Sequence, residues 1–73
     1  MQQQFIDAFK EALEIEGGVQ LTDNFRDYDE WDSLARLSLI AMLDDEYGIQ
    51  IEDAKFEQLK TVGDLIAAVE QAA

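Results

Sequence analysis

The chain has 73 residues, of which 48% are hydrophobic, and its 17 acidic against 5 basic side chains give a formal net charge of −12. Phosphate backbones and anionic membrane surfaces would repel this charge, so nucleic-acid binding and membrane insertion are not expected, while basic protein surfaces suit it as partners. The chain contains neither Cys nor His, and therefore supplies no thiol and lacks the usual general base near neutral pH.

Residues 3–15 are predicted to form the first helix. Phe5, Phe9 and Leu13 recur every four residues, as a buried stripe requires. We expect Gly17-Gly18 to end this helix, because glycine adopts the left-handed C-cap conformation at the lowest cost. No signal peptide is visible at the polar start, and no apolar run approaches membrane-spanning length, so a cytoplasmic protein is expected.

Residues 18–32 show no sustained period and are predicted to be a long loop. Such a connection is unusual in a small domain and is often functional. The loop is acidic, with Arg26 as its one cation, which favours a basic partner. Three aromatic residues are expected to hold the loop on the core: Phe25, Tyr28 and Trp31.

Residues 33–47 are predicted to form the second helix, with Asp32 as N-cap and Gly48 at its end. The predicted apolar face consists of Leu34, Leu37, Ile40, Ala41 and Leu43, with Leu39 and Met42 beside it. Asp44, Asp45 and Glu46 occupy the end where the helix dipole disfavours anions. This placement hints at a recognition surface, although a solvated acidic end explains it equally well.

The remaining chain is predicted to contain a short alternating piece, 49–51, and two more helices. Residues 53–58 give one or two turns anchored by Phe56. Thr61 and Asp64 form a capping box before a last helix that is expected to fray after Glu70. The sequence therefore predicts one domain, 1–73, folded as an all-α four-helix bundle with three longer helices and one short one.

Ser33, at the start of the second helix, is the candidate site residue. Catalysis by its hydroxyl would need a base, and no His or nearby Lys provides one. An EF-hand calcium loop with Gly48 as its glycine would begin at Leu43 and end at Ala54, which cannot act as ligands, so no metal site is predicted. A serine at a helix start is ordinary in itself. A phosphodiester on this hydroxyl would, however, suit the positive end of the helix.

The chain resembles the acyl carrier protein family, the phosphopantetheine-binding carriers, over essentially its whole length. The strongest part is the ungapped segment 31–51, with an Asp-Ser-Leu motif (32–34), an apolar helix, an acidic triplet (44–46), an aromatic residue and an Ile-x-Ile turn (49–51). Two flanking segments also resemble the family, namely 21–25 and 59–65. The three-residue motif alone is weak, but the ordered set is specific.

The resemblance implies that the Ser33 hydroxyl accepts 4′-phosphopantetheine from coenzyme A, in a reaction run by a separate magnesium-dependent phosphopantetheinyl transferase. The thiol of the arm would carry acyl groups as thioesters, which fits a chain without Cys. The protein itself would be a non-enzymatic monomer that docks acyl-loading and acyl-transfer enzymes through basic surfaces on those enzymes. The residues assigned to partner docking are Asp32, Leu34, Arg36, Asp44, Asp45, Glu46 and Phe56.

Several positions depart from the family pattern. Glu30 and Trp31 replace the frequent glycine and its neighbour, and Glu52 replaces a common proline. Arg36 and Ser38 stand where fatty-acid carriers are commonly acidic. Bulky Phe56 replaces a smaller residue and would narrow any acyl-sequestering cavity. These departures favour a specialised stand-alone carrier over the housekeeping fatty-acid carrier. The alternative is an unmodified acidic interaction module, such as an adaptor or a nucleic-acid mimic, in which Ser33 is structural.

Overall fold

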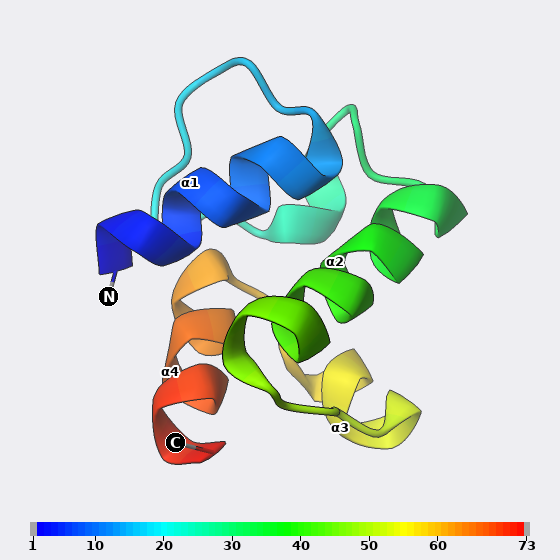
Figure 1. Ribbon diagram of the computed structural model, residues 1–73. Helices are drawn as coiled ribbons and strands as arrows, with labels where there is room; N and C mark the ends of the chain where they lie inside the picture. Colours follow the sequence, from blue (N-terminus) through cyan, green and yellow to red (C-terminus); the bar gives the residue numbers. More distant parts are fainter. Residues whose placement is uncertain (1, 73) are drawn as a thin grey trace.

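The computed structural model describes residues 2–72 and is all-helical, which confirms the predicted fold class (Figure 1). The four α-helices and one 3₁₀ turn of this part of the chain are, in order, α1 (Gln2–Leu13), η1 (Phe25–Asp27), α2 (Ser33–Tyr47), α3 (Asp53–Gln58) and α4 (Val62–Ala72). The loop between α1 and η1 arches over α1 and leads to η1, and the segment after η1 carries the chain to the start of α2 (Figure 1). No helix among residues 2–72 is long and apolar enough to span a bilayer.

Every helix contributes to one hydrophobic core. Four phenylalanines, Phe5, Phe9, Phe25 and Phe56, are at most 1% exposed. The other buried apolar side chains are Leu13, Ile15, Ala35, Leu39, Met42, Leu43, Leu59, Val62, Leu65, Ile66 and Val69. Their clustering explains how so acidic a chain folds, because no charged or polar residue among those described is buried with them.

The first helix ends at Leu13, two residues before the predicted end at residue 15. Glu14 adopts the left-handed conformation with φ of 57°. The Ile15 amide donates to the Lys10 carbonyl (2.9 Å) and the Glu14 amide to the Glu11 carbonyl (3.3 Å), as in a Schellman motif. The prediction that Gly17-Gly18 form this C-cap was wrong. The hydrophobic anchor Ile15 sets the end, because its burial outweighs the backbone cost at Glu14.

The bounds of α2 agree with the prediction. At its end, Gly48 has φ of 65° and donates its amide to the Asp44 carbonyl (2.8 Å). Its buried face, however, consists of Ala35, Leu39, Met42 and Leu43, whereas Leu34 and Leu37 are 70% and 61% exposed. The prediction of the buried face was therefore wrong in part, because the side of α2 that packs in the core is turned about the helix axis relative to the predicted side. Nearly continuous apolar sequence allowed two stripes, and packing against α1 selected the one that carries Ala35.

Backbone hydrogen bonds fix the long loop to the start of α4. The Phe25 amide donates to the Lys60 carbonyl (3.2 Å), the Val62 amide to the Asp23 carbonyl (3.0 Å) and the Gly63 amide to the Leu21 carbonyl (2.9 Å). A side chain at Gly63 would meet the Leu21 carbonyl oxygen at 3.2 Å, so the close approach suits a glycine. Phe25 is fully buried and Tyr28 and Trp31 pack on the core, as predicted.

The capping box before α4 is present. The Thr61 Oγ1 accepts from the Asp64 amide (3.1 Å), and the Asp64 carboxylate accepts from the amides of Thr61 (3.1 Å) and Lys60 (3.0 Å). The helix then continues to Ala72, beyond the end expected at Glu70. Ile49 and Ile51 are half-buried on either side of exposed Gln50, which matches the predicted alternation.

Candidate functional site

Ser33 is the first residue of α2 and is exposed, at the point where the long loop meets the helix. Asp32, in an extended conformation, caps the helix: its Oδ1 accepts from the Ala35 amide (2.7 Å) and its carbonyl from the Arg36 amide (3.0 Å). The sequence predicted this cap. Its effect is to fix the backbone on both sides of the Ser33 hydroxyl.

The geometry at Ser33 suits a covalently attached phosphate. The backbone amides of Ser33 and Leu34 donate to no acceptor among residues 2–72, so they remain unpaired at the positive end of a 15-residue helix. The Ser33 hydroxyl itself forms no hydrogen bond to a described residue that could activate it. No described residue is therefore placed to activate the Ser33 hydroxyl as a nucleophile.

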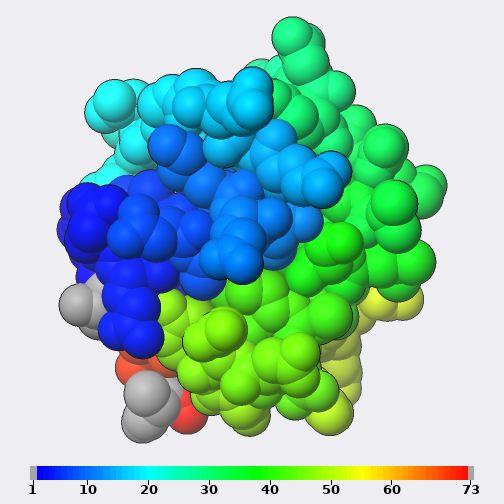
Figure 2. Space-filling model, turned by 45° about the horizontal axis from the view of Figure 1, so that its top comes forward, coloured from blue at the N-terminus to red at the C-terminus, as the bar shows by residue number. Residues whose placement is uncertain are grey.

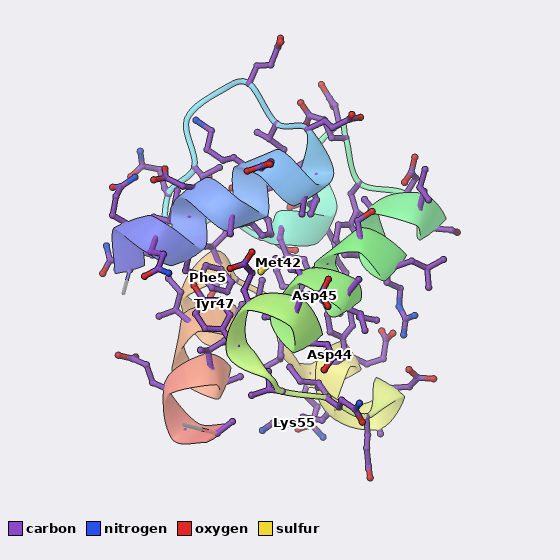
Figure 3. All side chains as sticks on the ribbon, viewed as in Figure 1. Phe5, Met42, Asp44, Asp45, Tyr47 and Lys55 are labelled. Carbon is purple, nitrogen blue, oxygen red and sulfur yellow. The ribbon has the colours of Figure 1, made fainter. Side chains whose placement is uncertain are left out.

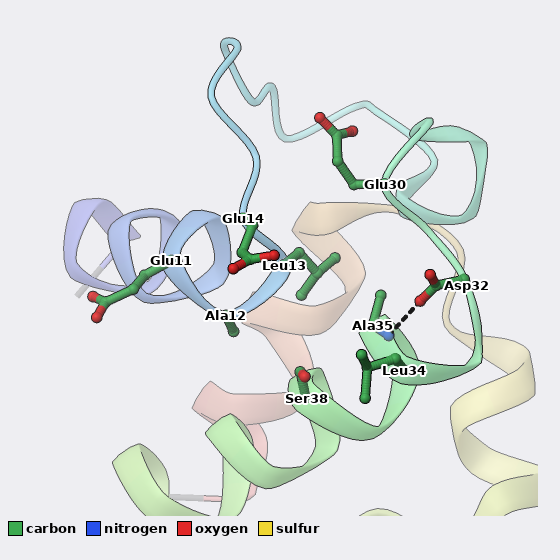
Figure 4. A pocket seen from close by; sticks show the side chains of 9 residues that line it. All are labelled: Glu11, Ala12, Leu13, Glu14, Glu30, Asp32, Leu34, Ala35 and Ser38. Atoms are coloured by element: carbon green, nitrogen blue, oxygen red, sulfur yellow. Dashed lines mark hydrogen bonds between the residues drawn. The ribbon is translucent and has the colours of Figure 1, made fainter.

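An open groove of about 270 Å³ lies beside the start of α2, between the end of α1 and the loop (Figure 4). Its apolar floor comes from Ala12, Leu13, Leu34 and Ala35, and Ser38 lies at its edge. Exposed carboxylates surround it, namely those of Glu11, Glu14, Glu30 and Asp32. Figure 2 shows the same face, on which α1, the loop and α2 meet.

The outward side of α2 combines apolar and acidic side chains. Leu34 and Leu37 are the most exposed large apolar residues among those described. Asp44, Asp45 and Glu46 are exposed at the other end of the helix, and no basic residue lies in its last turn. Figure 3 shows Met42 and Tyr47 directed toward Phe5, while Asp44 and Asp45 lie on the outside of α2. Sequence reasoning assigned Leu37 to the core and so missed it as a surface residue.

Arg36 and Phe56 lie together, but on the side of α2 that faces α3. Arg36 has a side chain 30% exposed, with its Nη2 3.1 Å from Asp53 Oδ1 and its guanidinium 5.2 Å from the centre of the Phe56 ring. Phe56 is only 1% exposed. Its assignment to the docking surface is therefore corrected: its side chain packs in the core and offers no face to a partner.

Arg26 is a residue whose importance the sequence analysis did not identify. Its guanidinium lies 4.7 Å from the centre of Phe25 and 5.2 Å from that of Phe56, and it donates to the carbonyls of Phe56 (2.9 Å) and Leu59. The sequence feature that could have identified Arg26 is that it is the single cation in an otherwise acidic loop.

The carboxyl groups with lowered pKa values lie in the loop and in α4. The backbone amide of Gln20 and the Tyr28 hydroxyl donate to Asp23 and lower its pKa. The amides of Lys60 and Thr61 lower the pKa of Asp64. Burial and the bond to Asp23 raise the pKa of Tyr28. Among residues 2–72, no group of three or more acidic side chains is placed to hold a metal ion.

Comparison with known proteins identifies the class. Residues 3–69 match the family described as "Phosphopantetheine attachment site". The chain belongs to this family of carrier domains, the family of acyl carrier proteins that its motifs resemble. The match confirms the resemblance and the prediction of phosphopantetheine as the cofactor.

Relatives of known sequence and a solved structure also support membership of this family. The chain is 38% identical over 50 residues to an acyl carrier protein of Tropheryma whipplei, covering 68% of this chain but only 61% of that relative. It is 29% identical to a meromycolate extension acyl carrier protein of Mycolicibacterium aurum, over 96% of this chain and 77% of that one. A Mycobacterium tuberculosis structure, provisionally described as an acyl carrier protein, superposes with a TM-score of 0.84 at 26% identity, covering 99% of this chain and 97% of that one.

Proposed function

We propose that this protein is a non-enzymatic acyl carrier whose Ser33 bears a 4′-phosphopantetheine arm and whose cargo is held on that arm as a thioester. The observation that carries the proposal is the exposed Ser33 hydroxyl, fixed by the Asp32 cap at the positive end of α2. The family match supports the cofactor, and the geometry supports the attachment point.

The residues around Ser33 have distinct roles in this proposal. Ser33 Oγ forms a phosphodiester with the phosphopantetheinyl group of coenzyme A, and the nucleotide part of coenzyme A leaves. The free amides of Ser33 and Leu34 and the helix dipole favour the negative charge of the product. The arm supplies a thiol, which a chain without Cys lacks. The base and the metal ion for the transfer come from the separate transferase.

Partner enzymes are proposed to bind the outward side of α2. Leu34 and Leu37 provide an apolar contact beside the arm, and the acidic residues Asp44, Asp45 and Glu46 attract a basic surface. Like-charged residues at the negative end of a helix cost stability, so a role in recognition accounts for their presence.

The proposal is tested by incubating the protein with coenzyme A, magnesium and a promiscuous phosphopantetheinyl transferase, and measuring the intact mass. We expect the mass of one arm to be added. Ser33 and Ser38 are the two serines of the chain, so they provide a matched pair of variants. Ser33→Ala should abolish the gain in mass, and Ser38→Ala should retain it.

The second candidate function is an acidic interaction module in which Ser33 is structural. The acidity of the loop and of the end of α2 favours it. It predicts no added mass under conditions that load a control carrier, together with a stable complex with a basic protein. The measurement of mass therefore separates the two functions.

A further inference from the structure

Three aromatic rings fill the space between the long loop and α3. Phe25 and Phe56 have ring centroids 5.8 Å apart, and Trp31 meets Phe25 edge-on at 5.2 Å. Trp31 also stacks on Phe56, at 6.4 Å with planes inclined by 16°. Phe25 and Phe56 are 0% and 1% exposed. These three residues, here called the aromatic plug, leave the core between the loop and α3 filled.

Arg26 holds the plug from the loop side. Its guanidinium lies over both Phe25 and Phe56, and it donates to the carbonyls of Phe56 and Leu59 at the end of α3. Cations are favourable next to the last carbonyls of a helix and over aromatic faces. Separation of α3 from the loop would break all of these contacts together.

Arg36 holds the plug from α2. Its guanidinium lies 5.2 Å from the centre of the Phe56 ring, and its Nη2 is 3.1 Å from Asp53 Oδ1 at the start of α3. Both ends of α3 are thus bound by an arginine, one from the loop and one from α2. Phe56 and the two arginine side chains therefore occupy the space where the loop, the first turn of α2 and α3 meet.

The plug lies next to the attachment site. Trp31 precedes Ser33 by two residues, and Arg36 follows it by three, which is about one helical turn. The groove on the other side of the α2 start is surrounded by four exposed carboxylates, which make a poor environment for a long aliphatic chain. Beside Ser33 there is thus a charged groove on one side of α2 and the filled aromatic plug on the other.

Building on the proposed function, we propose that the aromatic plug, held by Arg26 and Arg36, closes the core to the cargo, so that this carrier keeps its acyl group in solvent. Such a carrier suits short or polar acyl groups. Long aliphatic chains would leave apolar surface exposed to water. Phe56 is the specificity-determining residue, because its ring contacts the rest of the plug and both arginines.

The test compares two loaded forms of the protein, made with acetyl-coenzyme A and octanoyl-coenzyme A and verified by intact mass before unfolding is measured. We expect the two forms to melt at the same temperature. An octanoyl chain shielded by the protein would raise the melting temperature by roughly 4 °C or more, since burial of one or two methylene groups suffices for that shift in a domain of this size. Such a rise would overturn the inference, whereas failure to load at all would overturn the proposed function instead.

Variants at position 56 identify the side chain that closes the core. Phe56→Ala and the milder Phe56→Leu create space behind Trp31, so in a folded variant the octanoyl form should melt above the acetyl form. If Phe56→Ala does not fold, Phe56→Leu still gives the comparison. Equal melting of the two loaded forms in every folded variant would contradict the role assigned to Phe56.

Discussion

Leu37 and Leu39 are two residues apart on α2, yet they lie on opposite sides of the helix. Leu39 is 0% exposed and packs in the core, whereas Leu37 is 61% exposed and Leu34 is 70% exposed. The inward side stabilises the fold and the outward side leaves apolar surface in water without any benefit to folding. This difference supports the proposal that the outward side of α2 contacts partner enzymes.

The largest expected effect comes from the matched pair Leu39→Ala and Leu37→Ala. Removing the buried Leu39 side chain should lower the free energy of unfolding by about 2–5 kcal/mol, through lost burial and a cavity. Leu37→Ala should change it by less than about 0.5 kcal/mol. Urea titration followed by circular dichroism measures both. Equal losses for the two variants would show that the two sides of α2 are not distinct.

The outward side can be tested by its effect on partner binding. Leu34→Ser and Leu37→Ser together should raise the transferase KM roughly tenfold, since loss of a central apolar contact costs more than about 1 kcal/mol. Their melting temperature should stay near that of the wild type. Steady-state modification rates give the KM, and Gln50→Ser, an exposed change outside α2, is the control. An unchanged KM would assign the exposed leucines no role in docking this enzyme.

The two ends of α2 should respond in opposite directions to loss of a carboxylate. Asp32→Ala removes the side chain that accepts from the Ala35 amide and should cost about 1 kcal/mol of stability. Asp44→Asn removes an anion from the negative end and should stabilise by a few tenths of a kcal/mol. Thermal unfolding at low salt resolves the difference. A loss of stability in both variants would mean that Asp44 has a structural role not visible in its contacts.

Acid unfolding should depend on Asp23 in the loop and on Asp64 in α4. Hydrogen bonds lower the pKa of Asp23 and of Asp64 below their ordinary value of 3.8. Each contributes stability that is present above that value and is lost as the pH falls through the lower folded-state pKa. Asp64→Asn should therefore reduce the loss of stability below pH 3.8 relative to the wild type, and a pH series of urea titrations measures it. An identical acid dependence in the variant would contradict this assignment.

Much of this architecture could be predicted from the sequence because it depends on local rules. The cap at Asp32, the glycine at the end of α2 and the capping box of Thr61 and Asp64 each follow from residue types at fixed spacing. The proposed site at Ser33 follows from the same local pattern together with the ordered family motif.

The errors arose where tertiary packing decided between local alternatives. The apolar residues of α2 nearly surround the helix, so only the position of α1 selects the side that carries Leu39. Burial of Ile15 placed the end of α1 before the glycines. The contacts of Arg26 join residues about 30 positions apart, which no local pattern in a single sequence reveals.

The central claim is that Ser33 is the attachment point of the arm. Intact-mass measurement after treatment with coenzyme A and a promiscuous phosphopantetheinyl transferase tests it most directly. We expect one added arm on the wild type and on Ser38→Ala, and none on Ser33→Ala. An unmodified wild type beside a fully loaded control carrier, or an arm that persists on Ser33→Ala, would contradict it.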